Sequence, residues 1–194
     1  MDFSLIAVPV VRGMSHAQIE KEATEFLRLV APECLVAPRP TPMLEIFENR
    51  MHLLGFRVVV GKNVKGLGGV TDVTNRFIEI PLATYNQLEK GVPRARFTMA
   101  HECGHAQIHG KQAQMGTFAS SENVQFARRS ELRPFEDPEW QADTFAGAVL
   151  MPWQTMRILY ERGEMNVQTV MSIFQVSQAA ASRRVMRLQA SFEK

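Results

Sequence analysis

The first periodic segment of the chain is helical. Its apolar residues recur every three or four positions and therefore share one face of a helix: Ile19, Ala23, Phe26, Leu27 and Val30. Ser15 and Gln18 have the spacing of a capping box at the start of this segment. The pattern predicts an amphipathic helix over residues 15–30.

Residues 32–42 contain four prolines and predict a linker or an extended arm. A second helix is predicted to start with Thr41 as its N-cap and Pro42 at its first helical position, and Gly55 is predicted to end it. Residues 56–60 are rich in β-branched side chains, which favours a strand.

A glycine-rich segment, residues 61–69, predicts a turn and not a phosphate-binding loop, because it lacks a Gly-Lys-Ser/Thr ending. Residues 70–74 and 77–80 flank a two-residue turn and predict a hairpin, so that the strands form a small antiparallel or mixed sheet. The rest of the chain is mostly helical. The order of helices, then strands, then helices indicates a predominantly helical α+β fold with C-terminal helices.

The C-terminal pattern predicts two helices over residues 166–188, joined at residues 174–177 by a corner that resembles a helix-turn-helix. Three arginines lie on the second of these helices, as residues that contact phosphates would: Arg183, Arg184 and Arg187. We favour helices that close the core, because one short module makes a weak DNA binder. Direct DNA binding is the alternative. The predicted divisions are residues 1–40 (N-terminal helix and arm), 41–163 (core) and 164–194 (C-terminal helices).

Composition narrows the class of protein. Hydrophobic residues make up 45% of the chain and charged residues 22%, as in an ordinary globular protein. The net charge of +2 gives no strong field for nucleic acid or anionic lipid. No segment approaches the ~20 apolar residues of a membrane span, and the start of the chain lacks the basic leader of a signal peptide. Two cysteines are too few for a disulfide framework, so we expect a cytoplasmic protein.

The chemistry-bearing motif is His-Glu-Cys-Gly-His at positions 101–105, on the helix predicted to start near Pro93. Two histidines four positions apart project to the same side of a helix and can bind one metal ion together. Glu102 is rotated by about 100° from His101 and can reach a metal-bound water from the side, as a general base must. The structural alternative is two core histidines and a glutamate placed there by chance.

A third protein ligand is needed for a catalytic zinc site. Asp137 and Pro138 predict the start of another helix, whose first turn contains Glu139, the best-placed ligand. Asp143 lies one turn later and can hydrogen-bond a ligand histidine. Glu136 is the competing ligand, but it precedes the predicted helix. In the structural alternative, Glu139 only interacts favourably with the helix dipole, and Asp143 is an acidic residue on the surface.

His109 follows His105 by four positions, but His101 and His109 are ~12 Å apart along the helix axis, too far to share one ion. We therefore predict His109 to be a hydrogen-bonded residue at the end of the helix, with a role near the cleft as the alternative. Its imidazole, Tyr85 and Tyr160 are the candidates for stabilising an oxyanion.

Three blocks of sequence resemble the ImmA/IrrE family of metallopeptidases: RFTMAHECGH at residues 96–105, EWQADTFA at 139–146 and LMP at 150–152. The similarity covers approximately residues 41–190. The resemblance implies a gluzincin-like HExxH peptidase with a zincin-like fold, in which His101, His105 and Glu139 bind zinc and Glu102 is catalytic. Two positions depart from the family pattern, which usually has Leu where this chain has Cys103 and Asn where it has Asp143. Neither departure removes a ligand.

The resemblance further implies that the substrate is a protein, such as a helix-turn-helix repressor whose cleavage relieves repression. The expected mechanism is metal-assisted hydrolysis of a peptide bond, in which Glu102 takes the proton of the metal-bound water and returns it to the leaving amine. The alternative function is a DNA-binding or toxin–antitoxin-type regulatory protein with a structural or degenerate zinc site. Glu102 argues against that alternative, because binding alone does not require this residue.

Overall fold

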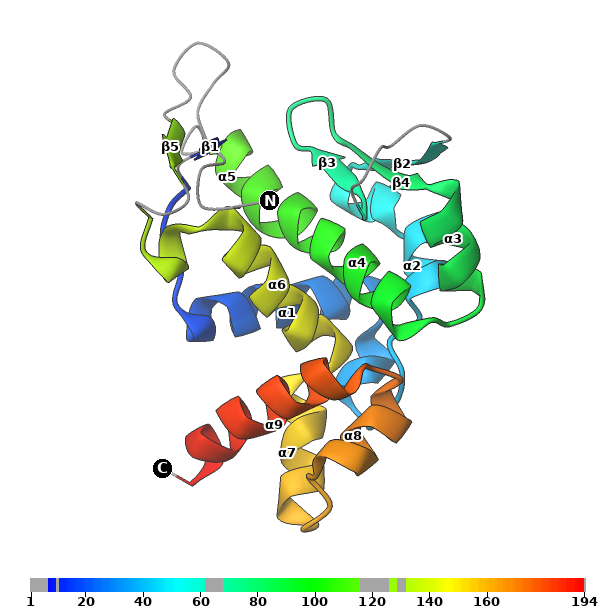
Figure 1. The fold of residues 1–194 in the computed structure, drawn as a ribbon, viewed down its shortest axis with the longest axis vertical. Coiled ribbons are helices and arrows are strands. Elements are labelled where there is room, and N and C mark those ends of the chain that lie inside the picture. The colour runs from blue at the N-terminus through cyan, green and yellow to red at the C-terminus, as the bar shows by residue number, and fades with distance from the viewer. Residues whose placement is uncertain (1–6, 10, 62–67, 116–125, 129–131, 194) are drawn as a thin grey trace.

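The structure is a computed structural model of the chain and describes all residues except 1–6, 10, 62–67, 116–125, 129–131 and 194. The described part is mostly helical with small sheets, which confirms the predicted α+β class (Figure 1). The α-helices are α1 (His16–Val30), α2 (Met43–Asn49), α3 (Leu82–Glu89), α4 (Pro93–Gly104), α5 (Gly110–Gln114), α6 (Pro138–Leu150), α7 (Trp153–Glu161), α8 (Val167–Phe174) and α9 (Gln178–Phe192). The strands are β1 (Ala7–Pro9), β2 (Arg57–Gly61), β3 (Val70–Asp72), β4 (Phe77–Pro81) and β5 (Phe126–Arg128). Short helical turns lie between them: η2 (Pro32–Leu35), η3 (Met51–Leu54), η4 (His105–His109) and η6 (Pro134–Glu136).

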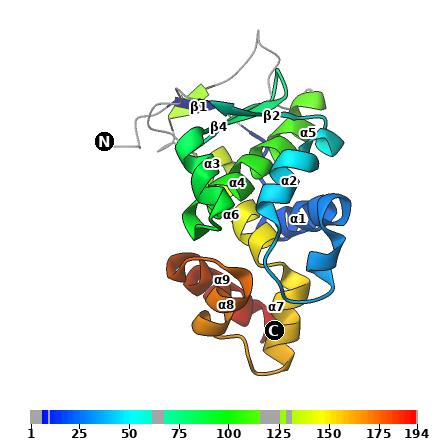
Figure 2. The ribbon, with the colours of Figure 1, turned by 90° about the vertical axis from the view of Figure 1, so that its right-hand side faces the viewer.

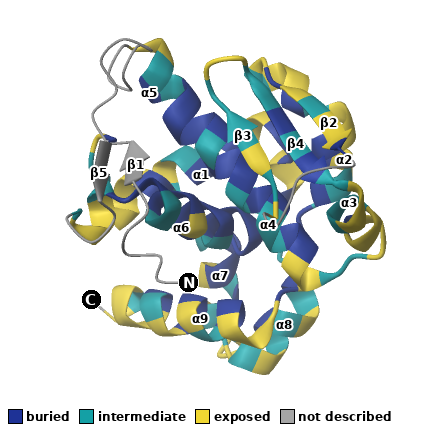
Figure 3. Cartoon of the chain, turned by 45° about the horizontal axis from the view of Figure 1, so that its top comes forward, coloured by how far each residue is buried: buried dark blue, intermediate teal, exposed yellow. Residues whose placement is uncertain are grey.

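The elements lie at three levels, as Figure 2 shows. The sheets occupy one end, α1, α4 and α6 lie in the middle, and α7, α8 and α9 form the other end. The buried core runs through the middle level (Figure 3), where the rings of Phe26 and Phe145 pack edge to face with centroids 5.5 Å apart. Burying a side chain of this size stabilises the fold by about 1.5–3 kcal/mol.

Helix α1 begins as its sequence predicts. Ser15 accepts a hydrogen bond from the Gln18 backbone, and the Gln18 side chain accepts one from the Ser15 backbone at 2.8 Å. The apolar residues that define the predicted face are all buried. The capping box and the helical period therefore locate this helix correctly.

The predicted N-cap of the second helix is wrong. Helix α2 starts at Met43 after Pro42, and Thr41 makes no side-chain cap. Instead, the buried Thr41 hydroxyl donates a hydrogen bond of 2.8 Å to the carbonyl of Val149 in α6. This long-range contact ties the proline-rich arm to the core, and a local capping pattern cannot reveal it. The helical segment ends, as predicted, at Gly55, which adopts a φ of 73° after η3.

The three-stranded sheet is mixed, which is one of the two predicted arrangements. Its strand order is β2-β4-β3, with β2 parallel and β3 antiparallel to β4. The β3–β4 turn is longer than predicted and places Arg76 at a φ of 55°. The Arg76 guanidinium donates hydrogen bonds to the carbonyls of Leu54 and Gly55, which holds this turn on the end of η3. This strand order leaves β3 at an edge of the sheet.

A buried arginine holds the C-terminal helices on the core. Arg184 of α9 is 3% exposed, pairs with Glu20 of α1 at 3.0 Å and donates to the carbonyl of Met151 at 2.9 Å. Arg187 also donates to Glu20, at 2.9 Å, whereas Arg183 is exposed. Because a buried guanidinium that is paired with a carboxylate is not available to a phosphate, these contacts support the interpretation that α8 and α9 close the core.

The predicted corner between α8 and α9 is present. Gln175 adopts a φ of 54° at the end of α8, and Ser177 caps α9 by accepting a hydrogen bond from the Ala180 backbone.

Among the described residues, no helix combines the length and the apolar character that a membrane crossing requires.

Candidate metal centre

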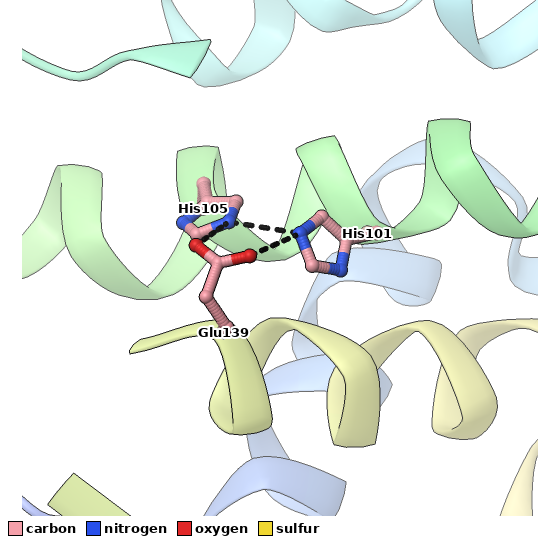
Figure 4. A group of neighbouring side chains, drawn as sticks. All are labelled: His101, His105 and Glu139. Atoms are coloured by element: carbon pink, nitrogen blue, oxygen red, sulfur yellow. Dashed lines mark hydrogen bonds and ion pairs between the residues drawn. The ribbon is translucent and has the colours of Figure 1, made fainter. Parts of the chain in front are cut away.

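Three side chains from two helices meet at one point, as Figure 4 shows: His101, His105 and Glu139. The Nε2 atoms of the two histidines are 3.0 Å apart. One carboxylate oxygen of Glu139 lies 3.4 Å from Nε2 of His101, and the other lies 3.4 Å from Nε2 of His105. The three groups therefore present one donor atom each to a common centre.

Local sequence explains how these side chains meet. His101 and His105 lie one turn apart, at the end of α4 and the start of η4. The side chain of Asp137 caps α6 by accepting a hydrogen bond of 3.0 Å from the Glu139 backbone, which fixes Glu139 in the first turn. A Cβ at Gly104 would lie 3.1 Å from the Cα of Ala142, a contact tighter than most, so glycine lets the two helices approach closely here without strain.

The donor set and its spacing fit a tetrahedral zinc ion. Zinc binds imidazole nitrogen and carboxylate oxygen at about 2.0–2.1 Å, so two of its ligand atoms are ~3.3 Å apart in a tetrahedron. The two histidine nitrogens are 3.0 Å apart, and each lies 3.4 Å from a different oxygen of Glu139, which is close to this spacing. With one donor atom taken from each residue, all three atoms lie within 4.8 Å of one another. Three protein ligands leave a fourth position open, as in catalytic sites.

The charges around the two histidines also suit a cation. Burial lowers the pKa of His101, but hydrogen bonds to Asp143 and Glu139 outweigh this effect and raise the pKa to about 10. Burial and the neighbouring His109 hold the pKa of His105 well below its usual range. Without a metal, the carboxylates thus keep a proton on His101, and a metal cation can take the place of this charge.

Asp143 lies on the outer side of the site. Its Oδ1 is 2.9 Å from Nδ1 of His101. When Nδ1 donates its proton to this carboxylate, the lone pair of Nε2 points to the common centre. Asp143 therefore contacts the outer nitrogen of His101, and its role in metal binding stays a prediction.

Glu102 lies in the same cleft as the three candidate ligands, which has a volume of about 480 Å³. The Thr71 hydroxyl of β3 donates to Oε2 of Glu102 at 2.6 Å. Burial raises the pKa of the Glu102 carboxyl, while the hydrogen bond from Thr71 opposes that shift. A Cβ at Gly69 would lie 2.8 Å from Cγ of Glu102, so this carboxylate rests directly against the glycine backbone.

A family model, Peptidase_M78, described as the IrrE N-terminal-like domain, matches residues 84–186, more than half of the chain. The chain belongs to this family. The match includes all three candidate ligands and Glu102, and it confirms the resemblance to the ImmA/IrrE metallopeptidases.

The M78 fold has a solved counterpart titled "Mycobacterium tuberculosis transcriptional regulator". The two structures agree with a TM-score of 0.53 at 14% sequence identity. The match covers 86% of this chain but 45% of the other, so this chain spans less than half the length of that protein. At this identity the likeness shows a shared fold. None of the curated proteins matches this M78 chain.

A second chain of hydrogen bonds controls His105. The amide nitrogen of Gln141 donates to the carbonyls of Arg12 and Phe135, at 3.0 and 2.8 Å, so its Oε1 accepts from Nε2 of His109 at 3.1 Å. Burial lowers the pKa of His109 to about 4, so its ring is neutral and Nδ1 accepts from Nδ1 of His105 at 2.9 Å. The remaining lone pair of His105 is then on Nε2, which faces the common centre.

These hydrogen bonds from Gln141 through His109 to His105 predict an effect of Gln141 on metal binding. We expect Gln141→Met to lower zinc affinity by about 10–100-fold, because His109 loses its acceptor and no longer holds His105 in one tautomer. Competition with a fluorescent zinc chelator measures the affinity. The matched control is Gln107→Met, which also removes a buried amide, one whose nitrogen donates to Glu22. Equal zinc affinities of the two variants would contradict the prediction.

Other sequence-predicted residues lie elsewhere. Glu136, the competing ligand, accepts a hydrogen bond from the Arg133 backbone at 3.2 Å and is not part of the candidate metal group among the described residues. The Tyr85 hydroxyl donates to Glu48, and Tyr160 packs on the ring of Phe192, so neither hydroxyl lines the cleft.

His109 is not at the end of the helix as predicted, because the helix continues through η4, a π-helical turn, into α5. Its 1% exposure and its contacts exclude it from the cleft surface. Sequence reasoning missed Thr71 and Gln141, which act through contacts with residues far away in the chain. The Gly68-Gly69 pair before β3 is the only local signal of a close backbone approach at this point.

Proposed function

We propose that this M78 chain is a zinc-dependent endopeptidase that cleaves a protein substrate. The observation that carries this proposal is the placement of Glu102 in the same cleft as His101, His105 and Glu139. A zinc ion held by these three residues would supply a Lewis acid and lower the pKa of a water molecule. Glu102 would be the general base that takes a proton from the attacking water and returns it to the leaving amine.

The residues around Glu102 suit this role. The Thr71 hydroxyl donates to one carboxylate oxygen of Glu102 at 2.6 Å and also lies 3.2 Å from the backbone carbonyl of Glu102, so Thr71 is close to both ends of this residue and holds its carboxylate in place. A base that is held in place before the substrate arrives needs little reorganisation during the reaction. Asp143 at the edge of the cleft and the buried His109 fix the orientation of the two histidines.

The edge strand β3 supports a polypeptide as substrate. Residues Gly69, Val70 and Thr71 line the cleft, and β3 pairs with β4 on its other side. An extended peptide can add to such an edge by backbone hydrogen bonds. This arrangement would lay a substrate backbone along the cleft, beside Glu102.

Within this proposal, the substrate class is a helix-turn-helix repressor, whose cleavage relieves repression, and the setting is the cytoplasm. The family resemblance supports this substrate, and the solved counterpart is titled as a transcriptional regulator. The two cysteines are free and buried, in agreement with a reducing compartment. Direct DNA binding by α9 is disfavoured by the burial of Arg184.

The test combines metal analysis with a cleavage assay. We expect about one zinc per purified chain, lost in His101→Ala, and zinc-dependent cleavage of a helix-turn-helix repressor encoded next to this gene. Removal of the metal by a chelator should stop cleavage, and added zinc should restore it. Stoichiometric zinc in His101→Ala, or cleavage that persists in the metal-free protein, would overturn the proposal.

A further inference from the structure

A second cavity continues the cleft on the side away from β3. It has a volume of about 280 Å³ and lies between α4, α6 and α9, with His16 of α1 at its edge. Phe97 and Asp143 line both this cavity and the cleft. A substrate in the cleft therefore has a side pocket beside it, which we call the α9 pocket.

The α9 pocket carries excess positive charge. Glu20 accepts hydrogen bonds from both Arg184 and Arg187, so one carboxylate serves two guanidinium groups. Arg183 lines the same pocket and is exposed, and its guanidinium has no hydrogen bond or ion pair to another described residue. Asp143 supplies negative charge at the opposite end, but its carboxylate faces His101.

Part of the wall of the α9 pocket is apolar and aromatic. Trp140 and His16 pack with ring centroids 4.9 Å apart, and Phe97 forms the boundary with the cleft. Such walls accept the methylene stem of a side chain, while Arg183 can receive a charged end. A guanidinium without a partner among the described residues, beside an apolar surface, suits a short acidic side chain.

A third cavity extends the path further. It has a volume of about 460 Å³, lies along α1, α7 and α9, and shares His16 and Arg187 with the α9 pocket. The cleft, the α9 pocket and this groove thus adjoin one another in a row. A row of adjoining cavities fits an extended polypeptide better than a compact small molecule.

We propose that the α9 pocket binds an Asp or Glu side chain of the protein substrate through Arg183 and thereby selects the bond to be cleaved. This inference rests on the proposed peptidase function and adds the substrate chemistry to it. It gives the exposed arginine of α9 a role in recognising a carboxylate.

The first experiment compares peptide pairs. Quenched fluorescent peptides from a cleaved region carry either Glu or Gln at each position near the scissile bond. We expect the zinc-loaded parent protein to prefer Glu at one position by roughly tenfold in kcat/KM, since a charge-assisted hydrogen bond has this magnitude. In Arg183→Gln the Glu/Gln ratio should fall to about one, and Arg183→Glu should favour Lys at that position.

The matched control is Arg162→Gln, which removes the same charge from an exposed position at the end of α7 and lines none of the three cavities. It should keep the parent Glu/Gln ratio. Equal rates for Glu and Gln peptides in the parent would overturn the inference. So would a loss in Arg183→Gln that is the same for both peptides, because a purely structural role would produce that result.

A binding measurement separates this inference from the peptidase proposal. Trp140 lines the pocket and Trp153 is the other tryptophan, so Trp153→Phe leaves a single reporter. In a Glu102→Gln, Trp153→Phe protein, the Glu peptide should change the fluorescence at lower concentration than the Gln peptide, and sodium acetate should not substitute for it. If no peptide is cleaved but this preference holds, the peptidase proposal fails while the pocket stands. Equal binding of both peptides, or an equal response to acetate, overturns the pocket.

Discussion

Glu102→Gln should stop peptide hydrolysis and leave zinc binding intact. The amide can still accept the hydrogen bond from Thr71, so the side chain keeps its place. It cannot accept the proton of a metal-bound water, and removal of a general base typically costs about 10²–10⁴-fold in rate. The measurement is kcat on a cleaved peptide, together with the metal content of the variant.

The matched control is Glu136→Gln, the same chemical change at a carboxylate outside the cleft, which should hydrolyse peptide at the parent rate. Parent-like activity in Glu102→Gln would show that another group is the base. Loss of zinc would instead reassign Glu102 as a ligand.

The direction in which Glu102→Gln changes the stability of the fold can also be predicted. Burial raises the pKa of Glu102 in the folded, metal-free protein. A raised folded pKa of an acid stabilises the fold at low pH, and this contribution is lost as the pH rises through the unfolded and then the folded value. At neutral pH the neutral amide should therefore give a melting temperature equal to or above that of the parent.

Glu139→Ala should nearly abolish zinc binding, whereas Asp143→Ala should weaken it by about 10–100-fold. One oxygen of Glu139 lies 3.4 Å from Nε2 of His101, and the other lies 3.4 Å from Nε2 of His105. Removal of this side chain therefore takes away a direct donor. Asp143 contacts only the outer nitrogen of His101, at 2.9 Å, so its removal loosens one imidazole. Zinc affinity measured by chelator competition should rank the parent above Asp143→Ala, and Asp143→Ala above Glu139→Ala.

The opposite order would show that the two carboxylates are assigned the wrong way round. If neither substitution changed the affinity, the third ligand would lie elsewhere. Circular dichroism of both variants checks that the fold is intact, because Glu139 is in the first turn of α6, where its charge also favours the helix dipole.

The sequence predicted the parts of this site that depend on local spacing. The i, i+4 period brought His101 and His105 to one side of a helix, and the Asp137-Pro138 start predicted the helix of Glu139. Both signals lie within a few residues of the groups that they position. The meeting of the two helices was inferred from the third-ligand requirement and from the family resemblance.

The parts that the sequence did not predict depend on long-range contacts. Thr71 is an ordinary strand residue until β3 passes Glu102, 31 positions later in the chain. Gln141 gains its role from carbonyls at positions 12 and 135. The π-helical turn at residues 105–109 also has no compositional mark, because it differs from an α-helix only in its hydrogen-bond register.

The pairing of Glu20 with Arg184 has a consequence for synthesis of the chain. The two residues are 164 positions apart, so the contact cannot form until α9 has left the ribosome as far as Arg184. The motif helix and α6 are complete well before that moment. The nascent chain thus acquires its candidate metal ligands first and one wall of the α9 pocket last. A chain that stops before α9 would leave Glu20 without its buried partner and the α9 pocket without one of its walls.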